Sequence, residues 1–145
     1  MSRVAIKCPS AFASSQHGSS AVEFAMLLPV FLTIVFGIVV FGSYLAIVHG
    51  VQQLAAEAAR SSVAGMTETE RSSLASTYVI NNAETYPLID STRLTINAAT
   101  SSSNANVFVV TVNYDASTMF IYSLPLVPKP ATLVTRSASI PYGGF

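Results

Sequence analysis

Charged residues are scarce in this sequence. Lysine, arginine, aspartate and glutamate together make up 10% of the 145 residues, and the formal net charge is zero, whereas an average soluble protein has roughly 25% charged residues. The few basic residues in the second half are scattered and form no stripe, so we expect no nucleic-acid partner. Hydrophobic residues reach 51%, and this excess must be concentrated somewhere in the chain.

Cysteine and histidine are also rare, which excludes several kinds of chemistry. Cys8 is the only cysteine, and His17 and His49 are the only histidines, so the sequence predicts no disulfide, no metal cluster and no other cofactor. No GxSxG or HExxH pattern occurs, and the abundant serines have no base placed to activate them. We therefore do not expect an enzyme.

One stretch, residues 24–48, holds no charged residue at all. Its 25 residues exceed the roughly 20 that a helix needs to cross a bilayer, and they exceed the apolar core of a cleaved secretory signal. A buried core helix is the alternative. Arg3 and Lys7 precede the stretch and the next basic residue is Arg60, so the N-terminus should be cytoplasmic and the C-terminal part should lie across the membrane.

Beyond the stretch, apolar and small residues recur at helical spacing up to Gly65, which is the expected stop. The residues on this stripe are Val51, Leu54, Ala55, Ala58 and Ser62. A helix from 24 to 64 would measure about 60 Å, twice the hydrocarbon thickness. The exported half must cover its stripe with the chain's own C-terminal part or with a neighbouring chain, and the pattern does not choose between them.

A second helix is expected to start at Thr67, because Thr67 and Glu70 match the capping-box pattern, and to end near Glu84, ahead of Pro87. The residues predicted to face a core are Leu74, Ala75, Tyr78, Val79 and Ala83.

Three strand-like runs follow at 93–98, 106–114 and 132–140, and the middle run is apolar on both faces, as in a central strand. The turn-forming residues 100–106 indicate an antiparallel hairpin. Residues 119–130 are apolar but carry three prolines, so they predict a packed loop or a short interfacial segment rather than a strand. The sequence thus predicts an α+β protein with a polar, extended leader (1–18), a long helix (19–64) and a module of one helix and a three-stranded antiparallel sheet (65–145).

The most informative residues stand immediately before the uncharged stretch. Gly18 is followed five positions later by Glu23, which directly precedes Phe24. Placing a carboxylate at the edge of a membrane span costs free energy, so the presence of Glu23 at this position needs an explanation. The simple interpretation is that Glu23 marks the membrane boundary in the first helical turn, where the helix dipole favours an acid.

The segment GSSAVEFAMLLPVFLTIVFGI, residues 18–38, resembles the signature of the TadE-like pseudopilins of the tight adherence (Tad) pilus, a branch of the type IV pilin superfamily. The shared features are small residues before the glutamate, Glu-Phe, a proline six residues after the glutamate, and then aliphatic residues with glycine. The later runs VTVNY, LPLVP and LVTRSASIPYG are more weakly similar to that family.

The resemblance implies a minor pilin or pseudopilin that acts in pilus assembly, adherence and biofilm formation. A prepilin peptidase would cut between Gly18 and Ser19, and Glu23 would then meet the new N-terminal amine of an adjacent subunit. The partners implied are this peptidase, other pilin subunits, the inner-membrane assembly platform and membrane lipid. The location implied is the bacterial inner membrane, with the C-terminal module in the periplasm and possible incorporation into an extracellular pilus.

Three further positions in the span are candidates for helix packing. Pro29 lies inside the span, where it invites a kink, and Gly42 with Ala46 forms a small-xxx-small face that permits close helix contact. The alternative function is an envelope scaffold or binding protein that is never cleaved and keeps its anchor; the N-terminus of the extracted protein separates the two.

Overall fold

The computed structural model describes residues 16–125 and 127–141, with the side chains of residues 16–19 left out. The predicted leader, with Arg3, Lys7 and Cys8, therefore lies mostly outside the described residues. The chain divides into two units, Met1–Val35 and Phe36–Phe145, which are described separately below.

The first unit consists of the beginning of helix α1, which has the bounds Gln16–Ser61. The helix thus begins three residues before Ser19, inside the leader that the sequence predicted to be extended. After Gln16, a good helix former, the residues His, Gly and Ser have modest or poor helix propensity, but a helix that is already nucleated extends easily across such residues.

The second unit contains the rest of α1 and the whole C-terminal module. After a short 3-10 turn, Ser62–Ala64, the chain reaches Gly65, the predicted stop. A Cβ atom at Gly65 would lie 2.7 Å from the backbone nitrogen of Arg71, so glycine is needed for the close approach of the next helix. That helix, α2, spans Glu68–Asn82.

The capping box predicted for α2 is confirmed. The Thr67 side chain accepts a hydrogen bond from the Glu70 N–H at 3.2 Å, and the Glu70 carboxylate accepts from the Thr67 N–H at 3.1 Å. Of the residues predicted to face the core, Ala75, Val79 and Ala83 are buried and Tyr78 packs against them. The prediction for Leu74 is wrong, because its side chain is 39% exposed.

Three antiparallel strands form the sheet, in the order β1-β2-β3. Their bounds are Leu94–Thr100, Val107–Asp115 and Leu133–Pro141. The middle predicted run is the central strand, as expected, and the hairpin between β1 and β2 falls at the turn-forming residues. Along β2, alternate residues are buried, which gives the sheet one face that is packed and one that is only partly covered.

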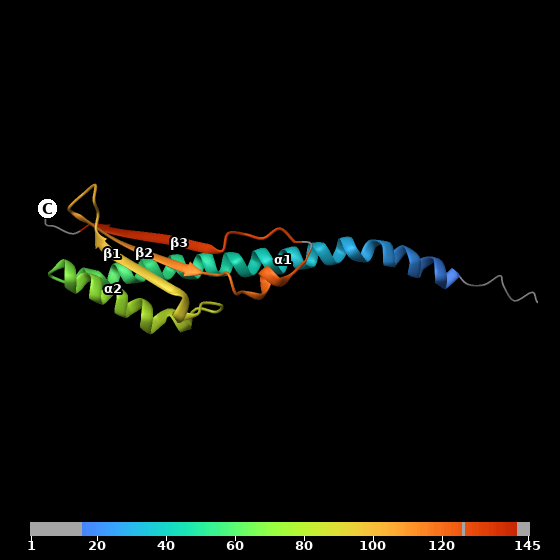
Figure 1. The fold of residues 1–145 in the computed structure, drawn as a ribbon, viewed down its shortest axis with the longest axis horizontal. Helices are drawn as coiled ribbons and strands as arrows, with labels where there is room; N and C mark the ends of the chain where they lie inside the picture. The colour runs from blue at the N-terminus through green and yellow to red at the C-terminus, as the bar shows by residue number, and fades with distance from the viewer. Residues whose placement is uncertain (1–15, 126, 142–145) are drawn as a thin grey trace, which may run out of the picture. The chain divides into compact units, whose positions relative to one another are not determined.

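The core of the second unit lies between this packed face and the C-terminal part of α1, with α2 beside β1 (Figure 1). The β2 side chains that it buries are Phe108, Val110, Val112 and Tyr114. All five residues of the helical stripe predicted on α1 are fully buried, and the small residues among them allow the sheet to approach closely. The chain's own module therefore covers this stripe.

The arrangement is the predicted α+β fold: a long N-terminal helix, a second helix and a three-stranded antiparallel sheet. The segment after β2 adds a short 3-10 helix, η4, at Phe120–Ser123.

Candidate functional site

The predicted cleavage position lies at the head of α1. Gly18 and Ser19 are the third and fourth residues of the helix, which starts at Gln16. The first four N–H groups of any helix have no partner within it, so the peptide bond between these residues lies in the turn that unwinds most easily. A peptidase that needs an extended backbone would have to open only this turn.

Glu23 lies seven residues after the helix start, and its side chain is exposed. The dipole of a helix acts mainly within its first turn, and α1 has no acidic residue there. The helix dipole therefore explains Glu23 poorly in the uncleaved chain. Ser19 and Glu23 stand four residues apart, which places them on one face of the helix.

The surface that follows Glu23 is apolar and uncovered. The helix is long and apolar enough to cross a membrane, with a mean hydropathy of 2.7 in its most apolar window, and the protein itself buries only 6% of that window. Side chains exposed by 58% or more include Phe24, Met26, Leu27, Val30, Phe31, Ile34 and Ile38. An apolar surface of this extent requires lipid or other chains around it.

The candidate packing residues are on this helix and open to a partner. The helix continues through Pro29 without interruption, and the Pro29 carbonyl accepts a hydrogen bond from the Thr33 hydroxyl at 2.8 Å. A Cβ atom at Gly42 would meet nothing within 4 Å, and Ala46 is exposed. The small-residue face is thus unoccupied by the protein's own module.

Gly50 has a role that the sequence did not indicate. A Cβ atom there would lie 2.8 Å from Cδ1 of Ile89 and 3.4 Å from Cδ1 of Tyr86, so the connection between α2 and β1 packs directly on the α1 backbone. Burial raises the pKa of the Tyr86 hydroxyl above its ordinary value. The glycine lies two residues after the end of the uncharged stretch, which is the one signal that could have suggested a close contact at that point.

The described residues of 119–130 pack against α1, as the first of the two predictions for this segment, a packed loop, requires. Ile121 and Val127 bury Val40 of α1, with Tyr44 and Tyr122 beside them. No local pattern in the sequence identifies Val40 as the contact.

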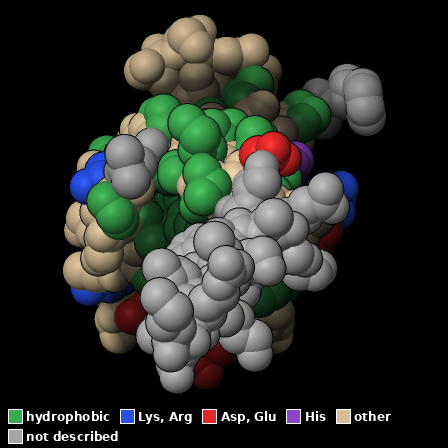
Figure 2. All heavy atoms as spheres, turned by 90° about the vertical axis from the view of Figure 1, so that its right-hand side faces the viewer, with side chains coloured by type: hydrophobic (Ala, Val, Ile, Leu, Met, Phe, Trp, Pro, Cys, Tyr) green, Lys and Arg blue, Asp and Glu red, His purple; other side chains and the backbone are tan. Residues whose placement is uncertain are grey.

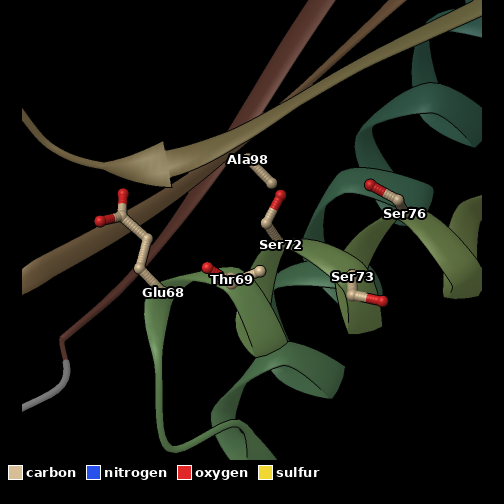
Figure 3. Close-up of a pocket in the computed structure, with 6 residues that line it drawn as sticks. All are labelled: Glu68, Thr69, Ser72, Ser73, Ser76 and Ala98. Atoms are coloured by element: carbon tan, nitrogen blue, oxygen red, sulfur yellow. The ribbon is translucent and has the colours of Figure 1, made fainter.

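Outside α1, a hollow lies between α2 and β1 and is lined mainly by hydroxyl groups (Figure 3). It is an open depression of about 480 Å³, and the Glu68 carboxylate at its edge accepts the Thr100 N–H at 2.8 Å. The other lining residues are Thr69, Ser72, Ser73, Ser76 and Ala98. No histidine or lysine lines the hollow to activate a serine, so it lacks the base of a nucleophilic site.

Charges in the module form small local groups. The Thr92 side chain and N–H hold the pKa of Asp90 below its ordinary value, and hydrogen bonds from Ser117 do the same for Asp115. Arg93 lies near both carboxylates, 3.8 Å from Asp90 and 4.0 Å from Asp115. Within the described part of the chain, no group of histidine, cysteine, aspartate or glutamate side chains could hold a metal ion.

Comparison with known proteins agrees with the features at the head of α1. Residues 18–60 match the family model described as TadE-like protein; neither the curated proteins nor the solved structures give a match. The match begins at Gly18 and covers the uncharged stretch and most of the buried stripe. Among the described residues one helix is long and apolar enough to cross a membrane, and together with this similarity it indicates a membrane anchor. The match confirms the resemblance inferred from the sequence: from Gly18 to Arg60 the chain is similar to the TadE-like proteins.

Proposed function

We propose that this protein is a minor pilin, or pseudopilin, that a prepilin peptidase cuts between Gly18 and Ser19. Its N-terminus would be cytoplasmic and its module periplasmic in the bacterial inner membrane. The mature subunit would then join a Tad pilus through the inner-membrane assembly platform, and so contribute to adherence and biofilm formation.

One observation carries the proposal. The family match starts at Gly18, the residue that the motif marks as the last of the leader, although the helix itself starts earlier, at Gln16. A match that reflected only a long apolar helix would have no reason to begin at this glycine. This start favours a processed pilin over a simple anchor.

Glu23 would have its role after cleavage. The cut creates an ammonium group at Ser19, four residues before the Glu23 carboxylate and at the edge of an uncharged span. Within a membrane each of these charges is costly alone and tolerable when paired with an opposite charge. In a staggered row of helices, Glu23 of one subunit would pair with the Ser19 amine of the next, while Gly42 and Ala46 would allow the helices to approach.

Processing is tested at Gly18. The variant Gly18→Val should remain a full-length precursor, because its branched side chain would stand where the peptidase must hold the backbone closely. Gly37→Val is the matched control, since a Cβ atom at Gly37 meets nothing within 4 Å, and it should be cut normally. Intact mass and N-terminal sequencing give the result; an N-terminus at Met1 or Ser2 in the unaltered protein would establish the uncleaved anchor instead.

Docking is tested at Glu23. The variant Glu23→Gln should be processed like the unaltered protein but should be lost from sheared filaments and from cross-linked complexes. Removing one partner of a buried ion pair costs about 3–5 kcal/mol, which corresponds to two to three decades in an association constant. Glu84→Gln, an exposed acid in the module, is the control and should assemble normally. Normal recruitment of Glu23→Gln would return Glu23 to the role of a boundary marker.

A further inference from the structure

The connection between β2 and β3, residues 116–132, has an unusual composition for a loop of an exported module. Residues 119–131 read MFIYSLPLVPKPA, with no acidic residue and with Lys129 as the one charge. The connection is closed at its base by a hydrogen bond from the Ala116 N–H to the Thr132 carbonyl at 2.8 Å. It is therefore a defined excursion from the sheet, and between Met119 and Ala131 its exposed apolar residues are Phe120, Pro125, Pro128 and Ala131.

This connection packs on a part of α1 that belongs to the uncharged stretch. Val40 is fully buried beneath Ile121 and Val127, although its neighbours Val39 and Phe41 are 41% and 43% exposed. The contact thus covers one side of the helix at this level and leaves the other side open. Both elements are in the second unit, and Figure 1 shows the connection running beside α1.

The position of Val40 in the stretch sets the depth of the contact. The uncharged stretch has 25 residues, 24–48, and about 20 suffice to cross the hydrocarbon. Even if all of the surplus lay at the C-terminal end, the hydrocarbon would extend to about residue 43. Val40 would then lie about 4–5 Å inside it, at about 1.5 Å per residue. The connection must follow α1 to this depth.

The chemistry of the connection suits such a position. Phe120 is 53% exposed on the short helix η4, where water would be a poor solvent for its ring. Prolines at 125, 128 and 130 lack N–H groups, which removes three donors that lipid could not satisfy. The Tyr122 hydroxyl and N–H are both bonded within the segment, to the Ala131 carbonyl at 2.8 Å and to the Met119 carbonyl at 3.1 Å.

Lys129 completes the pattern of an interfacial element. Its side chain is exposed, and a long basic side chain at a membrane boundary can extend its ammonium group to lipid phosphates while its stem stays in apolar surroundings. Figure 2 shows hydrophobic side chains on the face turned to the viewer, with lysine, arginine, aspartate and glutamate side chains toward its edges.

We propose that residues 119–125 and 127–130 form a second membrane-contact element. The segment lies in the leaflet on the side of the C-terminal module, with Phe120 among the acyl chains and Lys129 at the headgroups. This proposal depends on α1 being a membrane anchor and does not depend on the proposed role in the pilus. It holds the module against the bilayer in a fixed orientation, in place of a module that swings freely on α1.

The absence of tryptophan from the chain gives a direct test. The full-length variant Phe120→Trp, reconstituted in dilute vesicles of phosphatidylcholine and phosphatidylglycerol, should emit at short wavelength. It should lose most of that emission when the acyl chains are brominated near the headgroup. The control is Ile80→Trp on α2, where the side chain is 62% exposed. Its emission should be unchanged by brominated acyl chains and should be quenched by aqueous acrylamide.

Two results would overturn the proposal. One is quenching of Trp at 120 by acrylamide but not by brominated lipid. The other is emission that shifts only as the protein density in the vesicles rises, which would identify a second copy of the chain as the occupant of this surface. To guard against disturbance by the new indole, contacts between lipid acyl protons and the Phe120 ring should also be sought by NMR in the unaltered protein in nanodiscs. They should be present, and their absence would contradict the lipid contact.

Discussion

Replacing Tyr114 with phenylalanine removes one oxygen atom from the centre of the module. The Tyr114 side chain is only 2% exposed, and its hydroxyl donates to the Leu88 carbonyl at 3.1 Å and accepts the Asp90 N–H at 3.4 Å. These bonds hold the connection between α2 and β1. That connection contains Leu88 at a φ of 71°, a left-handed conformation that costs a residue other than glycine about 1–2 kcal/mol.

The expected loss of stability in Tyr114→Phe follows from the lengths of the two hydrogen bonds. A typical hydrogen bond contributes about 0.5–1.5 kcal/mol net; the first bond has ordinary length, and the second is at the limit. The Leu88 side chain is half exposed, so water can partly replace the hydroxyl. Tyr114→Phe should therefore lower the free energy of unfolding by about 1–2 kcal/mol. The amides of Ile89 and Asp90 should exchange with solvent faster, because Leu88 is then free to leave its strained conformation.

Urea denaturation of the full chain in detergent micelles, followed by the near-ultraviolet circular dichroism of its tyrosines, measures the first effect. Hydrogen exchange measures the second. The matched control is Tyr86→Phe, which removes a hydroxyl from the same connection where none of the described hydrogen bonds involves it, and it should change stability by less than about 0.5 kcal/mol. Equal stability and exchange in the two variants would refute the idea that Tyr114 holds the connection.

Three other outcomes are expected. Leu54→Ala should destabilise the module by about 2–5 kcal/mol in the same denaturation assay, because Leu54 is fully buried between α1 and the sheet; a neutral result would contradict this packing. Gly42→Leu should leave that stability unchanged, since the position is open, but should reduce cross-linking between subunits if the small-residue face packs helices. Hydrogen bonds from the Met66 and Thr67 N–H groups hold the pKa of Glu70 below its ordinary 4.5, so its stabilising effect is complete above pH 4.5 and is lost as the pH falls through the lowered value. The stability advantage of the unaltered protein over Glu70→Gln should accordingly shrink on acidification, and a constant difference across that range would remove the capping role.

The elements that follow local patterns could be predicted from the sequence. The stripe on α1 and the capping box of α2 both depend on residues within one or two turns of each other, and each has the expected geometry. The strands were placed within one or two residues of their observed bounds, because alternation and turn residues are equally local. The prediction for Leu74 was wrong because this residue lies at the edge of the apolar face of α2. Only the position of the sheet decides which edge of that face is covered.

Contacts between distant segments could not be predicted in this way. Val40 and Ile121 are 81 positions apart, and neither periodicity nor composition links them; the prolines of 119–130 indicated a packed or interfacial loop without saying what it packs on. Gly50 is similar, because its close approach to Ile89 depends on where the connection after α2 returns to α1. At the head of α1, spacing and resemblance identified Gly18, Ser19 and Glu23, and their roles remain predictions.

On the proposed topology, with the module in the periplasm, the simple strand order has a consequence for how the module forms during export. In the order β1-β2-β3 every strand pairs with its neighbour in sequence, so each hairpin can close as soon as its second strand has crossed the membrane, and such local closure is fast. The C-terminal part of α1, which forms the opposite side of the core, crosses first. Its apolar stripe stays exposed until the strands, which cross later, pack on it. Maturation is thus ordered from the N-terminus to the C-terminus. A chain stalled before Leu133 would present a hairpin whose β2 edge is still unpaired, a natural target for periplasmic chaperones and proteases.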